Sequence, residues 1–255
     1  MPDEADFGEN DGPAPVLTAM AESPQSAEDE ARNAEKASNA PKIRKRDASA
    51  TRARILEASR TEFSEHGYSG ARIDRIAKSA QSNVQMIYRY FGSKEALYLT
   101  VLEDTYARVR SRERQLQLGD YEPREGMKRL VEFTFDYLIE DPVFVAIIRN
   151  ENVAGGRFVS MSDQVPASTL PLVEAIVDLM KRGQKAGVFK REVDPTQLYI
   201  TILSLCFTHL SNQHTLSVMF QRDLSNKTWL AERRTHVVDV VLTFLTCDCT
   251  QSNCG

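Results

Sequence analysis

The sequence predicts an all-α protein with a small N-terminal helical domain and a larger C-terminal helical bundle. Along most of the chain, apolar residues recur at spacings of three and four, the period of one helical face. Glycine and proline breaks separate these periodic segments, for example at Gly67, 119–123 and 141–142. Two late segments, 194–216 and 228–246, are apolar nearly all round and must therefore be buried on both sides.

Charge is spread unevenly over the 255 residues. Residues 1–41 contain ten acidic and two basic side chains and almost no large apolar residue. Such a segment cannot bury enough surface to offset its ordering entropy, so we expect a disordered acidic tail. Residues 42–98 contain twelve basic and six acidic side chains. This basic region suits a polyanionic partner, although the whole chain has a net charge of −4.

Membrane, metal and cofactor binding are not expected. No apolar run reaches the roughly 18–20 residues that span a bilayer, and the acidic N-terminus does not resemble a secretory signal. We therefore expect a cytoplasmic protein. Cys206 lies in an apolar segment and is expected in the core. The other cysteines lie in 247–255, a segment expected to be a flexible tail, and their C-x-C-x4-C spacing is not a standard zinc pattern.

The N-terminal domain is expected over 49–109 and begins with a helix over about 49–66. Gly67 ends this helix, since glycine readily takes the positive φ of a helix C-terminus. Two short helices then form a helix-turn-helix over about 71–90. Gln81 interrupts the apolar period between them, and Asn83 can cap the second helix through its side-chain oxygen.

The second helix of a helix-turn-helix can lie in the major groove of DNA and read bases with its N-terminal residues. Gln85 can form two hydrogen bonds with adenine, and Val84 and Met86 can contact a thymine methyl group. Side chains with a hydroxyl or a positive charge suit phosphate oxygens. The DNA contacts expected in this motif are Arg72, Asn83, Val84, Gln85, Met86, Tyr88, Arg89 and Tyr90. A basic arm, 42–48, adds Lys42, Arg44, Lys45 and Arg46, directed at phosphates or the adjacent minor groove.

The remaining helices follow from the breaks between them. They are expected over about 93–116, 124–140, 142–152, 167–186, 194–216 and 228–246. Ser93 can cap the first of these helices, and proline lies in a first turn at Pro142 and Pro195. We expect 194–216 and 228–246 to pair with their counterparts in a second copy of the chain, because each has more apolar surface than one neighbour can cover.

The block GYSGARIDRIAKSAQSNVQMIYRYFGSKEALY resembles the DNA-binding region of the TetR family of bacterial transcriptional regulators. The matching residues are Phe63, Gly67, Tyr68, Ile73, Ile76, Ala77, Ile87, Tyr88, Phe91, Ser93, Lys94, Glu95 and Leu97. The resemblance implies a DNA-binding domain at 49–109 and a ligand-binding and dimerisation domain at 110–246. It also implies that Tyr88 and Lys94 contact the DNA backbone, and that Tyr68 is a packing residue.

Three positions depart from the family pattern. Ala71 replaces a threonine that caps the next helix, and Ser82 replaces an apolar residue that packs under the turn. Gln81 replaces a glycine, so a positive φ at this position would be strained. These departures concern how the motif docks and which bases it prefers, not whether the motif is present.

The function implied by the resemblance is a repressor that binds a palindromic operator as a homodimer and is released by a small-molecule effector. Five polar residues near apolar helical faces are candidates for an effector pocket, namely Arg149, Asn150, Asn152, His209 and Gln213. Asp194-Pro195, which opens an apolar helix, loosely resembles the pyrimidine-utilisation subgroup of the family.

Two other functions stay open at this point. The first is a DNA-binding regulator without a small-molecule ligand, acting constitutively or through a partner protein. The second is an enzyme. The sequence has no Gly-rich phosphate loop, no Glu-x-x-His pair and no nucleophile elbow, so an enzyme is not expected.

Overall fold

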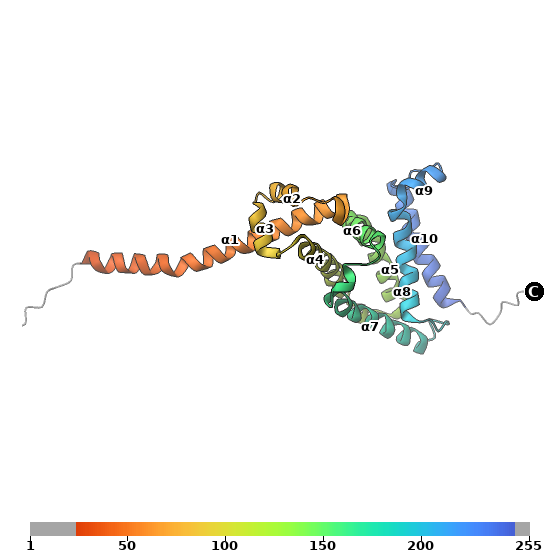
Figure 1. Ribbon diagram of the computed structural model, residues 1–255. Coiled ribbons are helices and arrows are strands. Elements are labelled where there is room, and N and C mark those ends of the chain that lie inside the picture. The colour runs from red at the N-terminus through yellow and green to blue at the C-terminus, as the bar shows by residue number, and fades with distance from the viewer. Residues whose placement is uncertain (1–23, 248–255) are drawn as a thin grey trace, which may run out of the picture. The chain divides into compact units, whose positions relative to one another are not determined.

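The computed structural model describes the backbone of residues 24–247 and the side chains of residues 47–247. All regular elements in this part of the chain are helical, which confirms the all-α class (Figure 1). The elements are α1 (Pro24–Gly70), α2 (Ile73–Ser79), α3 (Val84–Phe91), α4 (Lys94–Arg114), η1 (Leu118–Asp120), α5 (Pro123–Glu140), α6 (Pro142–Val153), η2 (Val159–Met161), α7 (Gln164–Lys185), α8 (Pro195–Ser211), α9 (Gln213–Met219) and α10 (Lys227–Thr246).

The first helix differs from the expected one at its start. α1 begins at Pro24, not near residue 49, so the backbone is helical where a disordered tail was expected over 24–41. Alanine, glutamate, lysine and arginine are frequent there, and these residues have high intrinsic helix propensity. Residues 1–23 of the expected tail and the side chains of the basic arm, 42–46, lie outside what the structure describes. Gly67 interrupts α1 with φ 63°, which confirms its expected role.

The head, defined here as residues 50–109, packs α2, α3 and the second half of α1 against α4. Its core is formed by large buried side chains, among them Ile55, Phe63, Ile76, Ile87, Leu97 and Tyr98. Ile147 of α6 and Phe158, which follows α6, belong to the same cluster. The head is therefore packed directly against α6 and the segment that follows it.

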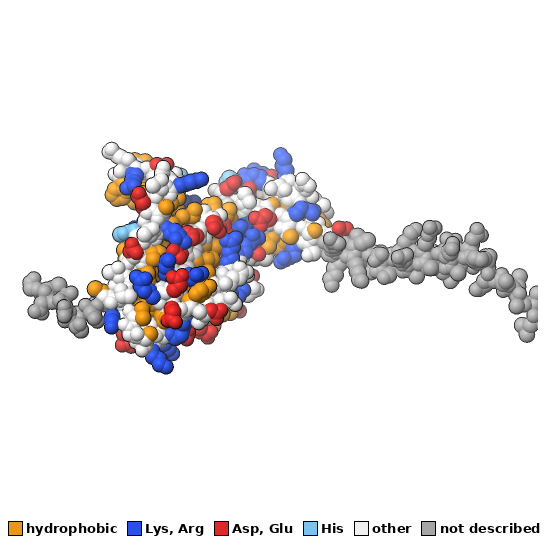
Figure 2. All heavy atoms as spheres, turned by 180° about the vertical axis from the view of Figure 1, so that it is seen from behind, with side chains coloured by type: hydrophobic (Ala, Val, Ile, Leu, Met, Phe, Trp, Pro, Cys, Tyr) orange, Lys and Arg blue, Asp and Glu red, His pale blue; other side chains and the backbone are white. Residues whose placement is uncertain are grey.

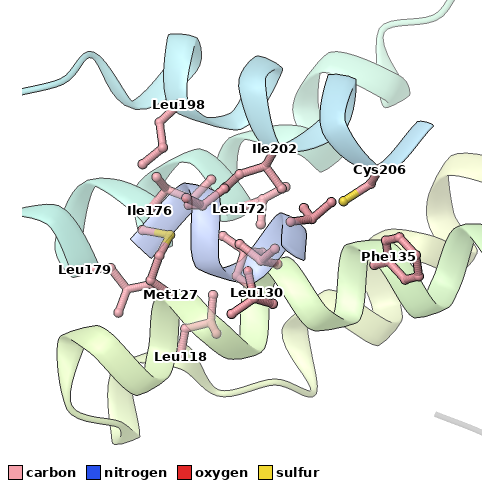
Figure 3. Close-up of a cluster of buried hydrophobic side chains, with 14 of the residues drawn as sticks. Leu118, Met127, Leu130, Phe135, Leu172, Ile176, Leu179, Leu198, Ile202 and Cys206 are labelled. Carbon is pink, nitrogen blue, oxygen red and sulfur yellow. The ribbon is translucent and has the colours of Figure 1, made fainter. Parts of the chain in front are cut away.

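The body, defined here as residues 110–246, has its own core around α5 (Figure 3). Side chains from α5, α7 and α8 meet there, among them Met127, Leu130, Phe135, Ile176, Leu179, Leu198 and Ile202. Cys206 is completely buried in this cluster, as expected from its apolar segment. Within residues 24–247 no helix is both long and apolar enough to cross a membrane.

Two helices of the body have different limits from those expected. α7 starts at Gln164, inside the segment expected to be a loop, and η2 lies just before it. The expected helix over 194–216 is broken, because α8 ends at Ser211 and α9 begins at Gln213. The Nδ2 group of Asn212 donates to the Thr208 carbonyl at 3.0 Å. Side chains that bond to nearby carbonyls compete with the helical pattern and promote such an end.

α8 and α10 each retain an outward face with exposed apolar residues. Ile200 on α8 is 51% exposed, and Val240 and Phe244 on α10 are 38% and 40% exposed. The single chain leaves these faces uncovered, so their burial depends on the expected pairing with a second copy of the chain, which stays a prediction. Hydrophobic side chains are also exposed at the α9 end (Figure 2), where Val218, Met219 and Phe220 lie.

The close contact between Gly183 and Phe189 allows a test of the packing in the body. A Cβ atom at this position in α7 would overlap the buried ring of Phe189, whose N–H donates to the Gly183 carbonyl. We expect Gly183→Ala to lower the free energy of unfolding by about 1–3 kcal/mol, because overpacking forces the ring to move. Gly119→Ala is the control, since a Cβ atom added there would meet no described atom within 4 Å beyond its chain neighbours. Equal denaturant midpoints for the two variants would contradict this account.

Candidate nucleic-acid interface and body cavity

α3 is fixed to the head by its cap and its apolar underside. The Asn83 side chain accepts from the Met86 N–H at 2.8 Å, which confirms the expected cap. Ile87 and Phe91 are buried beneath the helix. The opposite face is exposed and contains Val84, Gln85, Tyr88 and Arg89, while Met86 and Tyr90 are half-buried. The predicted base-reading side chains therefore lie at the surface of the helix tip.

The turn before α3 has the geometry that a glycine would favour. Gln81 has φ 49°. Its N–H donates to the Lys78 carbonyl, and the Ser82 N–H donates to the Ala77 carbonyl at 2.9 Å. This pair of bonds is the Schellman motif that ends many helices. The family's turn is therefore kept, with a glutamine in the left-handed conformation.

Glu62 of α1 stabilises the start of α2, where the family's capping threonine is absent. The N-cap residue is Arg72, and its N–H donates to Glu62 Oε1 at 2.8 Å. Arg75 Nε donates to the same oxygen at 2.8 Å. Burial raises the pKa of Glu62, but the hydrogen bonds from Arg75 and Arg72 outweigh it, so the pKa lies below its usual value.

Two predicted phosphate contacts are engaged within the head. Arg72 is exposed, and its guanidinium binds both oxygens of Asp74, at 3.0 and 2.9 Å. Lys94 Nζ donates to the Ala71 carbonyl at 2.7 Å and lies 4.8 Å from the centre of the Tyr68 ring. Burial lowers the pKa of Lys94. Tyr68 itself packs on Tyr98, as expected of a packing residue.

Asp141 joins the head to the body. Its carboxylate pairs with Arg60 of α1 and caps α6 by accepting from the Phe144 N–H at 3.0 Å. The Tyr137 hydroxyl of α5 donates to the same carboxylate at 3.2 Å. Burial, and then the nearby Asp141 charge, raise the pKa of Tyr137 to about 12, so this hydroxyl remains a donor at neutral pH. Three helices thus meet at one carboxylate.

A cavity of about 300 Å³ lies between α4, α5, α6 and α8 in the body. Six aromatic side chains line it, namely Tyr106, Phe133, Tyr137, Phe144, Tyr199 and Phe207. The size is at the lower end of the range for small-molecule sites, and an apolar lining with few polar groups is typical of them. We call the contacts of Asp141 with Arg60, the Phe144 N–H and Tyr137 the Asp141 junction. Tyr137 belongs to this junction and also lines the cavity.

The five predicted pocket residues lie in different places. Asn152 lines the cavity. Arg149 and Gln213 line a separate hollow beside α6 and α9. Asn150 donates from Nδ2 to the Phe63 and Ser64 carbonyls, both at 3.2 Å, and so fastens α6 to α1. His209 is buried, stacks on Phe135 and is not among the cavity's lining residues. Burial lowers its pKa to about 4, so it is neutral at pH 7.

The polar side chains Arg110 and Glu113 line the cavity but were not among the residues expected there. Both are nearly buried, and Arg110 Nη1 lies 2.6 Å from Glu113 Oε2. A signal for them exists in the sequence. They follow Tyr106, on the inner face of its helix, by four and seven residues, a spacing that keeps them on the same face.

Two family models match the chain. The model for "Bacterial regulatory proteins, tetR family" covers residues 55–101, and the model for "Tetracyclin repressor-like, C-terminal domain" covers residues 123–241. The chain is 37% identical over 200 residues to the HTH-type transcriptional repressor NicS of Pseudomonas putida, which spans 78% of this chain and 94% of that protein.

Two further proteins are similar to parts of the chain or to its fold. The HTH-type transcriptional repressor SCO4008 of Streptomyces coelicolor is 57% identical over 58 residues, or 23% of this chain and 30% of that protein. The crystal structure of the transcriptional regulator SCO4942 of the same organism has a TM-score of 0.56 at 24% identity, covering 75% of this chain and 96% of that one.

A helix-turn-helix head on a helical body is the architecture of a DNA-binding transcriptional regulator. The family models and the 37% identity to a repressor over most of its length identify the family. This protein belongs to the TetR family, as the sequence resemblance implied. Regulators of this family bind DNA and act as dimers.

The positive φ of Gln81, in the turn between α2 and α3, allows a test of backbone strain in the head. We expect Gln81→Gly to raise the free energy of unfolding by about 0.5–1 kcal/mol, because glycine takes φ 49° without the steric cost that a side chain adds there. Thermal unfolding measures the change. Lys78→Gly, in α2 itself, is the matched control and should destabilise by about 1 kcal/mol. A loss of stability in both variants would show that the turn is not strained.

Proposed function

We propose that this protein is a repressor that binds a palindromic operator as a homodimer and leaves it when a small molecule occupies the body cavity. The observation that carries the proposal is the sharing of Tyr137 between the cavity and the Asp141 junction, which also holds Arg60 of the head. A ligand that moves the Tyr137 ring acts directly on the contact that positions α1.

The DNA-bound state uses the exposed tip of α3. Gln85 reads a base edge in the major groove, flanked by Val84 and Met86, and Asn83 lies at the start of the same tip. Tyr88, Arg89 and Tyr90 contact phosphates, and Arg72 and Lys94 do the same after exchanging their present partners. Two heads related by a two-fold axis place their recognition helices about one helical turn of DNA apart, which requires a palindromic site.

The dimer forms through the outward faces of α8 and α10. Ile200, Val240 and Phe244 are exposed there in the single chain. Burying apolar area is the main driving force for such association, at about 25 cal/mol per Å². A four-helix arrangement of these faces is therefore the proposed contact between the two subunits.

The effector acts by preferring the state that does not bind DNA. A preference of about 1–3 kcal/mol changes operator affinity by roughly 5–150-fold. The alternative is a regulator without a small-molecule ligand, controlled by a partner protein or constitutive. A screen of small metabolites by thermal shift separates the two, since a ligand that binds only the folded state raises the apparent stability.

Gln85 is the residue that tests the base-reading role. We expect Gln85→Ala to weaken operator binding by about 1–3 kcal/mol and to relax the preference at one base pair of each half-site. Footprinting on the protein's own promoter, followed by titration of the protected site and its single-base variants, measures both effects. Gln115→Ala, an exposed glutamine at the end of α4, is the control and should bind like the wild type. Unchanged affinity and preference for Gln85→Ala would remove the base contact.

The junction itself is tested by a double-mutant cycle. Arg60 is 7% exposed, and its other acidic neighbour, Glu57, lies farther away at 3.8 Å, so removing Asp141 leaves a nearly buried charge with only this weaker partner. We expect Arg60→Met or Asp141→Asn alone to lower the free energy of unfolding by about 3–5 kcal/mol, and the double variant to lose little more than either. Denaturant unfolding of the four proteins gives the coupling energy. Strict additivity would mean that the two groups do not act as a pair.

A further inference from the structure

The polar end of the body cavity is formed by Arg110, Glu113 and Tyr199. Arg110 and Glu113 side chains are 8% and 5% exposed, so both charges are nearly removed from water. Arg110 Nη1 donates to the two Glu113 oxygens at 2.8 and 2.6 Å and to the Tyr199 hydroxyl at 3.2 Å. The same two charged side chains also line a neighbouring cavity of about 230 Å³ on the α7 side.

The Arg110 guanidinium has unused hydrogen-bonding capacity. A guanidinium carries five N–H donors, and the bonds above all use Nη1. The Nε group of Arg110 is buried and has no hydrogen-bond partner among the residues that the structure describes. Leaving a buried charged donor without a partner is costly. Nε itself is not open to the cavity, but Arg110 lines it and none of the bonds above uses Nη2, so this end of the cavity favours a molecule that brings a hydrogen-bond acceptor to the guanidinium.

The net charge of the site favours an uncharged molecule. Arg110 and Glu113 neutralise each other at a separation of 2.6 Å. An anion or a cation added beside them would leave one uncompensated charge in a low-dielectric cavity, which is strongly unfavourable. A carbonyl or amide oxygen accepts from arginine without adding a net charge.

The walls of the cavity favour a flat ring. Six aromatic side chains surround the space, including Tyr106, Phe144 and Phe207, and offer faces and edges for aromatic stacking. A volume of about 300 Å³ corresponds to roughly ten water molecules, enough for one or two substituted rings.

We propose that the effector is a flat, uncharged aromatic molecule of one or two rings, whose carbonyl-type oxygen accepts a hydrogen bond from Arg110. This inference rests on the proposed function, since it names the class of molecule that the body cavity takes. Arg110 holds the acceptor, Glu113 keeps the site neutral, and the aromatic walls hold the ring. A ring that has an N–H or O–H group next to its carbonyl also donates a hydrogen bond to the Glu113 carboxylate.

Single-ring probes of matched size test the class directly. They are benzamide, benzoate and benzylamine, which are neutral, anionic and cationic at pH 7, with toluene as the apolar reference. We expect benzamide to bind the full chain with a dissociation constant on the order of millimolar, at least about tenfold tighter than benzoate or benzylamine. Chemical-shift titration in the absence of DNA measures all four affinities.

Two variants assign the binding to the Arg110 end. Arg110→Met combined with Glu113→Leu removes both charges together, which avoids a buried unpaired group. It should bind toluene like the wild type but benzamide about tenfold more weakly, and toluene binding shows that the cavity has formed. Arg149→Met is the matched control, because this arginine lines the separate hollow and not the cavity. Its benzamide affinity should not change.

The outcomes separate this inference from the proposed function. Benzoate or benzylamine binding as tightly as benzamide would overturn the uncharged class. A loss of benzamide affinity in Arg149→Met but not in the double variant would overturn the assignment to Arg110. Absence of binding by all four probes at tens of millimolar would overturn the site. Benzamide binding as expected, together with failure of any cavity ligand to release operator DNA, would leave the class intact and remove the proposed release.

Discussion

The carboxylate of Asp141 is the polar contact that ties the head to two helices of the body at one point. It pairs with Arg60 of α1, caps α6 and accepts from Tyr137 of α5, so one side chain constrains three helices. Asn150, two turns farther along α6, adds a second fastening to α1 through the Phe63 and Ser64 carbonyls. α6 is therefore held to the head by polar bonds at both ends. Polar contacts of this kind have strict geometry, which makes them suited to switch between discrete states.

The helix-turn-helix keeps its geometry although three of the family's usual residues are replaced, and the structure shows how the replacements at Ala71 and Gln81 are accommodated. Glu62 receives the Arg72 N–H at the start of α2, where Ala71 cannot cap, and Gln81 takes the left-handed conformation that glycine would normally supply. Each substitution is compensated locally, by a carboxylate from the neighbouring helix or by the strength of the Schellman bonds. The departures from the family pattern therefore affect the local stability of the motif and not the shape of its backbone.

Most of the fold could be predicted from the sequence because its signals are local. Proline, glycine and asparagine mark helix ends at Gly67, Asn83 and Pro142, and the structure has helix ends at or beside each of them. The break at Asn212 was missed because it depends on competing side-chain bonds in the polar stretch 211–215, which the expected helix over 194–216 included. The cavity was the hardest part. A polar residue beside an apolar face can fasten a helix, as Asn150 does, or line a space, as Arg110 does, and only tertiary packing separates the two.

If Arg72 and Lys94 contact DNA as proposed, the bonds that engage them within the head affect the thermodynamics of recognition. Asp74 and the Ala71 carbonyl already take the place of a phosphate for these two cations. In each contact with a phosphate, Arg72 or Lys94 then exchanges its internal partner for the phosphate, so the contact does not neutralise an unpaired charge. Counterion release still supplies the entropy of association, but part of it offsets the broken internal bonds. Because phosphate contacts carry no sequence information, this exchange weakens the attraction to any duplex, and discrimination between sites is left to the proposed base contacts of α3.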